Sequence, residues 1–95
     1  MPRRRRRRRV RSQPNVKRFG PDKGKNNQKV TLKVEEFEAI RLKDLQGLDQ
    51  NEAAEKMNIS QPTFYRTLVS ARKKVADALV NGKSLEVKGG DYETS

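Results

Sequence analysis

The second half of the chain carries a long helical pattern of apolar and polar positions. From Gln61 to about Val80, apolar side chains recur every three or four residues, which predicts one long helix that buries a single face. Gly82 follows this pattern and is a typical helix stop. The expected inward residues are Phe64, Leu68, Ala71, Val75 and either Ala78 or Leu79.

A shorter helical pattern lies upstream, from about Val34 to Gln46, and Gly47 is its natural stop. Its apolar positions form a broad stripe, as expected of a helix that packs one side against a core. The positions in this stripe are Phe37, Ile40, Leu42 and Leu45.

The segment between these two patterns predicts a short helix, a tight turn and the start of the long helix. The short helix is expected from Gln50 to Met57, because Asp49 can cap it and Glu52, three residues on, completes a capping box. Asn58 then suits a left-handed turn position, which asparagine tolerates better than most residues.

Further positions agree with a helix-turn-helix over residues 50–72. Ser60 is a good N-cap for the second helix, and Pro62 falls in the first turn, where a missing N–H costs little. Ala54 is small, as the close approach of two crossing helices requires. The apolar side chains expected to lock the two helices together are Ile59 and Phe64. We interpret the segment as a DNA-reading helix-turn-helix, with a generic helical hairpin as the alternative.

Two brief alternations indicate strands. Val30 and Leu32 alternate with polar residues, and Leu85 and Val87 do the same before a pair of glycines. We expect residues 85–88 to pair with residues 30–33 as a short two-stranded patch. Apart from this patch, the predicted fold class is all-α: a helix-turn-helix domain of three to four helices behind a disordered basic N-terminal arm.

Charge is concentrated in that arm. The chain has 23 basic residues against 12 acidic ones, for a net charge of +11, and thirteen of the basic residues lie within residues 1–29 beside a single acid, Asp22. So polar a segment buries too little apolar surface to fold alone. We therefore expect a disordered arm over residues 1–29, a DNA-binding domain over 30–92 and a tail over 93–95. The arginine run comprises Arg3, Arg4, Arg5, Arg6, Arg7, Arg8 and Arg9.

Such an arm has several expected partners. Arginine-rich segments bind phosphates without reading sequence, or enter the narrow minor grooves of A·T tracts. They bind structured RNA equally well. Because the domain behind the arm is interpreted as a DNA-reading helix-turn-helix, we expect the arm to bind duplex DNA as well, with RNA as an alternative.

Charge is also sorted within the domain. Acidic residues crowd the two earlier helices, whereas residues 61–74 contain none and carry four basic side chains. A helix that lies against phosphates needs such sorting, although a solvated charged face is the alternative. The N-terminal part of the second helix is the part that enters the major groove in a helix-turn-helix. The candidate DNA contacts are Ser60, Gln61, Pro62, Thr63, Tyr65, Arg66, Arg72, Lys73 and Lys74.

Residue chemistry separates base readers from phosphate contacts among these candidates. Gln61 can pair with adenine through its amide, and Arg66 can form a fork to guanine. Ser60 and Thr63 are better suited to phosphates, helped by the helix N-terminus. Tyr65 suits a thymine methyl group or a phosphate. The three cations at 72–74 are expected to be backbone contacts or solvated charges, and an i,i+4 pair of Lys73 with Asp77 is an alternative.

The missing residue types exclude several classes of chemistry. The chain has no cysteine and no histidine, which removes disulfides, thiolate zinc sites and Ser-His-Asp or Cys-His arrangements. We expect no metal, no cofactor and no enzyme activity; the acids Glu35 and Glu38 share a helix face, but acids favour a helix start. No apolar run reaches the ~20 residues of a membrane helix. The expected location is the cytoplasm, at the nucleoid.

Three pieces of the sequence together resemble a family of small prokaryotic predicted DNA-binding proteins that is largely uncharacterised. They are E-F-E-A-I-R-L, N-E-A-A-E-K-M and G-K-S-L-E-V-K-G-G-D-Y. The similarity covers roughly Val30 to Tyr92, with a weaker echo through Pro14, Phe19 and Pro21. The helix-turn-helix of that family is similar to the one in region 4 of bacterial sigma factors.

The resemblance implies a helical DNA-binding domain without a winged-helix sheet and a role as a regulator, with no activity established for the family. Carried over position by position, it places residues 60–63, 65 and 66 on the reading segment. Gln61 departs from the pattern, because arginine is expected there in S-R-P-T-F. The seven-arginine run is also heavier than the family's usual short basic start.

Two functions remain from the sequence. The first is a sequence-specific DNA-binding protein that regulates transcription. The second is a nonspecific nucleoid-associated or RNA-binding protein whose affinity comes from the arm. A homodimer is an open alternative to a monomer, because helix-turn-helix proteins often bind DNA as dimers, yet no heptad seam is present.

Overall fold

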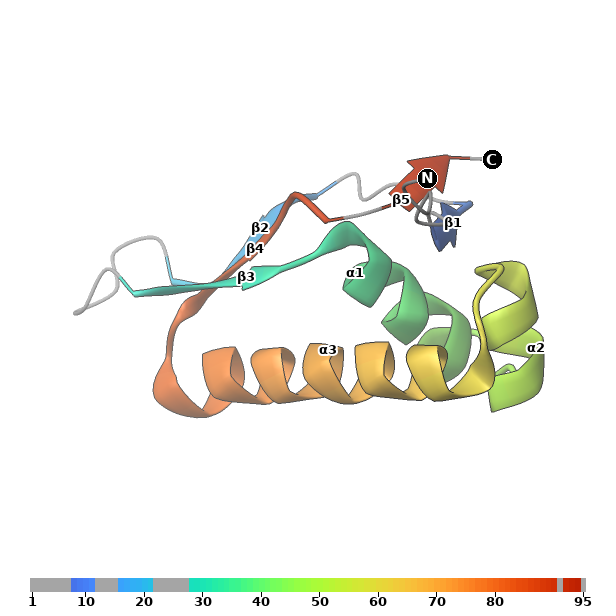
Figure 1. Ribbon diagram of the computed structural model, residues 1–95. Coiled ribbons are helices and arrows are strands. Elements are labelled where there is room, and N and C mark those ends of the chain that lie inside the picture. The colour runs from blue at the N-terminus through green and yellow to red at the C-terminus, as the bar shows by residue number, and fades with distance from the viewer. Residues whose placement is uncertain (1–7, 12–15, 22–27, 91, 95) are drawn as a thin grey trace, which may run out of the picture.

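The computed structural model describes residues 8–11, 16–21, 28–90 and 92–94. Along the described chain, three strands come first, the helical segments follow, and two more strands come last. In Figure 1 the labelled strands all lie above α3. The helical segments are α1 (Val34–Ile40), its continuation η1 (Arg41–Leu45), α2 (Gln50–Lys56) and α3 (Gln61–Asn81). The strands are β1 (Arg8–Val10), β2 (Arg18–Phe19), β3 (Lys29–Leu32), β4 (Ser84–Val87) and β5 (Tyr92–Thr94).

The two central helices and the turn between them follow the predicted capping pattern. The Asp49 carboxylate accepts a hydrogen bond from the N–H of Glu52 (2.8 Å), and the Glu52 carboxylate accepts one from the N–H of Asp49 (3.2 Å). Asn58 takes the predicted left-handed backbone, with φ of 58°. Ser60 Oγ accepts from the N–H of Thr63 at 3.3 Å, as an N-cap should. The capping predictions are therefore confirmed.

A buried cluster joins α1, η1, α2 and α3 at their shared end. Phe64 is fully buried at its centre, Ala54 is buried as well, and Ile59 packs against the cluster from the turn. Burying an aromatic of this size is worth about 1.5–3 kcal/mol, so the cluster holds α3 firmly against α2. Its members are Ala39, Leu42, Ala53, Ala54, Met57, Phe64 and Leu68.

The prediction that Leu45 lies in the core is wrong. The helix of residues 34–45 changes to a wider π-helical turn at Arg41, and the N–H of Gln46 bonds back five residues to the Arg41 carbonyl (2.9 Å). A wider turn rotates later side chains away from the stripe that an ideal α-helix would present. Leu45 is consequently 80% exposed, although Leu42 is buried as predicted.

The all-α prediction is also wrong, because a small mixed sheet packs along one side of α3 (Figure 1). Its order is β2-β4-β3, with β3 parallel to β4 and β2 antiparallel to β4. The predicted pairing of the two alternating segments is confirmed, with Leu32 opposite Val87. The fold is therefore α/β. The domain differs from the helical one that the resemblance implied, because β2 of the N-terminal segment joins the predicted β3–β4 pair and completes a three-stranded sheet.

The N-terminal segment, for which the sequence predicted a disordered arm, contributes two strands among its described residues. β2 pairs with β4, and Gly20 then approaches Ser84 so closely that a Cβ would lie 2.8 Å from the Ser84 Cα. β1 pairs in parallel with β5. Residues 1–7, 12–15 and 22–27 of the predicted arm lie outside the described residues.

A second buried cluster connects these strands to the helices. Val10 of β1 is fully buried, beside Val34 at the start of α1 and Ala71 in α3. The members of the cluster are Val10, Leu32, Val34, Ala71 and Val87. The sheet, β1 and the C-terminal half of α3 thus share one core. Among the described helices, none is both long enough and apolar enough to cross a membrane.

Candidate nucleic-acid interface

The N-terminal half of α3 presents one exposed face. Phe64 and Leu68 point into the core, and the residues between them point outward. Tyr65 is 53% exposed and Val69 is 44% exposed, so both side chains are accessible on this face. The exposed stripe, as we call this face, comprises Gln61, Pro62, Tyr65, Arg66, Val69 and Lys73. It contains every predicted base reader.

Hydrogen bonds among neighbours order the first turn of α3. Ser60 Oγ donates to Thr63 Oγ1 at 2.9 Å, in addition to capping the helix. An Arg66 guanidinium N–H lies 3.5 Å from the same Thr63 oxygen, a long contact that leaves the guanidinium on the surface. The Gln61 amide donates to Asn51 Oδ1 at 3.1 Å, which ties the start of α3 to the start of α2. Sequence reasoning missed Asn51, because nothing local connects residues ten positions apart.

The three basic residues at 72–74, which are candidate DNA contacts, have different surroundings. Arg72 forms a two-pronged ion pair with Asp44 of η1, through Nε at 3.1 Å and through Nη2. The hydrogen bonds between these two side chains lower the pKa of Asp44 and raise the pKa of Arg72. Lys74 pairs with Glu36 at 2.8 Å. Among the described residues, Lys73 forms no ion pair. The alternative i,i+4 pair with Asp77 is absent, since Asp77 accepts from Asn81 and Lys83.

Glu36 is the ion-pair partner of Lys74, whose side chain is only partly exposed. Its carboxylate is buried at the start of α1 and accepts from the Lys74 ammonium, from Ser70 Oγ at 2.6 Å and from the Lys33 N–H at 2.9 Å. Burial alone would raise the pKa of Glu36, but these hydrogen bonds outweigh it and hold the pKa below its ordinary value. Two cations of the stripe side of α3, Arg66 and Lys73, are therefore without an ion pair in this part of the chain.

Of the seven arginines that are predicted to bind DNA, the structure describes Arg8 and Arg9, and both lie on β1. The main-chain N–H of Arg9 donates to the Met57 carbonyl at 3.0 Å, at the C-terminal end of α2. Arg8 is half-buried, and its Nε has no hydrogen-bond partner in the described structure. Arg3, Arg4, Arg5, Arg6 and Arg7 lie outside the described residues.

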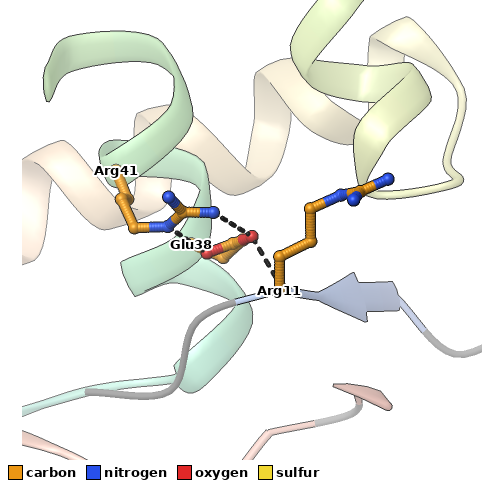
Figure 2. Close-up of polar contacts among 3 residues, drawn as sticks. All are labelled: Arg11, Glu38 and Arg41. Atoms are coloured by element: carbon orange, nitrogen blue, oxygen red, sulfur yellow. Dashed lines mark hydrogen bonds and ion pairs between the residues drawn. The ribbon is translucent and has the colours of Figure 1, made fainter. Parts of the chain in front are cut away.

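A further contact near β1 was not predicted from the sequence. The main-chain N–H of Arg11 donates to Glu38 Oε2 at 3.0 Å, and the Arg41 guanidinium donates to both oxygens of the same carboxylate (Figure 2). The hydrogen bonds to Glu38 raise the pKa of Arg41. Arg11 and Glu38 are 27 residues apart, so no sequence spacing announces the contact.

Comparison with known proteins gives relatives but no characterised activity. The chain is 59% identical over 85 residues to a UPF0251 protein of Thermoanaerobacter pseudethanolicus, covering 87% of this chain and 72% of the relative. It is 56% identical over 86 residues to one of Caldanaerobacter subterraneus subsp. tengcongensis, covering 88% and 73%. It is 52% identical over 94 residues to one of Methanothermobacter thermautotrophicus, covering 99% of this chain and 50% of the relative.

No solved structure gives a significant match. The profile of the family described as "Protein of unknown function DUF134" matches residues 1–95. This match covers the whole sequence, and the relatives are more than half identical over most of it. The chain therefore belongs to the DUF134 family, whose curated members here carry the name UPF0251.

Proposed function

We propose that this protein binds duplex DNA sequence-specifically, with the N-terminal half of α3 in the major groove, and that it regulates transcription. The observation that carries the proposal is the exposed stripe. It combines donors, an aromatic ring and two cations that have no ion pair among the described residues, on a helix whose opposite face is locked into the core. A rigidly held helix loses little entropy when it docks, which favours specific readout.

The chemistry of the stripe divides between bases and phosphates. Arg66 has a free guanidinium edge that can pair with guanine O6 and N7. Gln61 donates one amide N–H to Asn51 and retains its carbonyl oxygen and second N–H, the two groups that adenine requires. Lys73 lies about three turns along the helix, where a phosphate of the same groove is the expected partner.

Charge separation supports a docking direction. Three acids of α1 and η1 form ion pairs: Glu36 with Lys74, Glu38 with Arg41 and Asp44 with Arg72. The repulsion that these carboxylates would exert on a phosphate backbone is thereby reduced. Residues 61–74 carry no acid at all, so the stripe is the part of α3 suited to face DNA.

The proposal is tested by selecting bound fragments from genomic DNA with the full chain. The affinity for the selected sequence is then compared with that for random duplex at one salt concentration. We expect a ratio of about 10³ or more. A ratio near one would overturn sequence-specific binding and favour a nonspecific binder that depends on the arginine-rich segment.

Removing residues 1–7 separates the two contributions. Each phosphate that the protein no longer neutralises lowers the slope of log affinity against log salt by about 0.9 on duplex DNA. We expect the truncated protein to show a flatter slope and weaker binding to every sequence, with the specificity ratio retained. Loss of the ratio with affinity retained would mean that the arginines read the sequence through the minor groove.

A further inference from the structure

Strand β1 is held in place from several directions. The Arg9 N–H bonds to the Met57 carbonyl, and the Arg11 N–H bonds to Glu38, both at 3.0 Å. Val10, between these two residues, is fully buried in the second core cluster. A short strand that is fixed at three successive residues has a defined position relative to α1 and α2.

Glu38 is the buried member of this arrangement. It is fully buried, whereas the Arg41 side chain is 17% exposed. Arg41 Nε donates to Oε1 at 2.7 Å and Nη2 donates to Oε2 at 2.9 Å, so the carboxylate is neutralised from its own helix. Oε2 of Glu38 also accepts a hydrogen bond from the main-chain N–H of Arg11. A hydrogen bond to an ionised carboxylate is stronger than one between two neutral groups. Figure 2 shows the Arg11 side chain extending away from Glu38 while its main chain faces the carboxylate.

The alternation of β1 decides where its arginines point. Side chains along a strand alternate between two faces, so Arg9, and Arg11 directly after the strand, are expected on the face opposite the buried Val10. Arg11 is exposed, and its guanidinium forms no hydrogen bond or ion pair with other described residues. The Met57 carbonyl that anchors β1 directly precedes the turn into α3. The exposed Arg11 and the half-buried Arg9 therefore lie near that turn.

We propose that Glu38 is a positioning residue, which locks β1 onto the domain so that Arg9 and Arg11 contact phosphates of the same duplex that α3 reads. The inference rests on the proposed function and deepens it. A guanidinium pairs with two phosphate oxygens at once, and a fixed strand loses less entropy on binding than a free arm does.

The docking of β1 is tested first without DNA, by amide hydrogen exchange on the full chain. We expect the Arg9 and Arg11 amides to be protected in the wild type. Both should exchange faster in Glu38→Ala, while the amide of Leu68 in α3 keeps its protection. Glu38→Gln retains an acceptor oxygen and should restore part of the Arg11 protection. Exchange of the wild-type Arg11 amide at the rate of a free chain would overturn the docked strand.

The contact with phosphate is tested by a double-mutant cycle on duplex DNA. Arg11→Gln removes the charge but keeps the main-chain N–H that bonds to Glu38. It should weaken binding several-fold and lower the salt slope by about 0.9. In the Glu38→Ala background the same substitution should have a much smaller effect, because Arg11 is no longer placed. Lys88→Gln is the control: it removes one charge from an exposed lysine directly after β4, which pairs with Glu86 at 3.0 Å, and it should leave the slope unchanged.

Each result separates this inference from the proposed function. Additive effects of Arg11→Gln and Glu38→Ala, in a protein that binds its selected sequence, overturn the positioning role alone. A wild type that binds no duplex overturns the proposed function together with the phosphate contact. If Glu38→Ala lowers the melting temperature so far that it cannot be assayed, Glu38→Gln takes its place in the cycle. Partial coupling then supports the inference, and full additivity overturns it.

Discussion

The starts of α1 and α3 use charged and polar side chains in opposite ways. At the start of α1, three glutamates are buried, with Glu36 bonded to Lys74 and Glu38 bonded to Arg41. At the start of α3, the polar side chains are exposed, and those of Gln61 and Arg66 bond to near neighbours on the surface. The first set holds the fold together, and the second is accessible to a partner.

The position of each helix start explains the difference. The start of α1 contacts the second core cluster and β1, so its carboxylates lose water and need partners from the protein. The first two turns of α3 cover the core on one side and leave the other side open. Helix starts rich in polar residues are therefore not equivalent, because burial decides which of them stabilise the fold and which remain free to bind.

The largest expected effect is on the buried side of the α3 start. Phe64→Ala should lower the free energy of unfolding by about 3–5 kcal/mol, because it leaves a cavity where the helices cross. The adjacent Tyr65→Ala is the matched control and should change stability by less than about 1 kcal/mol, since Tyr65 is exposed. Denaturant melts of both variants measure the contrast. Equal losses would mean that the two faces of the helix are not distinct.

The stabilising role of the α1 start is tested by measuring the free energy of unfolding as a function of pH. The pKa of Glu36 is lowered in the folded protein, so its contribution to stability is present above its ordinary pKa of 4.5 and is lost as pH falls through the lower folded value. Glu36→Gln should reduce the free energy of unfolding by about 1–3 kcal/mol near pH 7, because bonds to a charged group are lost. The variant and the wild type should converge as pH falls through the lowered pKa of Glu36 in the folded protein.

A matched variant separates this effect from a general change of charge. Glu55→Gln removes one acid from an exposed position on α2 and should follow the wild type across the pH range. Unfolding free energies measured between pH 3 and pH 7 decide the matter. A constant difference between Glu36→Gln and the wild type over this range would contradict the pKa argument.

The binding role of the α3 start is tested on DNA. Arg66→Ala should weaken binding to a selected sequence by about 1–3 kcal/mol and relax base preference at one position. Its stability should change by no more than about 0.5 kcal/mol, because the side chain makes only a long contact with Thr63. Equal loss on selected and random duplex would reduce Arg66 to a phosphate contact.

The smallest expected effect concerns Asp44, which lies between the two roles. Its ion pair with Arg72 is exposed on both sides, so Asp44→Asn should cost no more than about 1 kcal/mol of stability. The substitution releases Arg72, and we expect modestly tighter binding to all duplexes with a steeper salt slope. Arg72→Gln should not tighten binding. Unchanged affinity in Asp44→Asn would show that Arg72 lies outside the DNA footprint.

The parts of the fold that local sequence could predict are those with local causes. The capping box at Asp49, the left-handed turn at Asn58 and the N-cap at Ser60 each depend on residues within three positions, and all three predictions are confirmed. The DNA-contact roles of Gln61 and Arg66 stay predictions, although both side chains lie on the exposed stripe. The exposure of Leu45 was missed, because the change to a π-helical turn has no clear sequence signal.

The sequence by itself determined the helix boundaries, the turn between α2 and α3 and the concentration of charge at the N-terminus. It also identified Phe64 as the buried side chain that joins these two helices. Only the tertiary structure decided which charges are free. Lys74 and Arg72 look equivalent to Lys73 along the chain, yet two of the three meet carboxylates from distant segments. The same is true of β1, whose burial and anchoring depend on Glu38 and Met57. The alternating pattern did predict the pairing of β3 with β4. These ion pairs and anchoring hydrogen bonds, in contrast, follow from packing in three dimensions, and no local period or spacing encodes them.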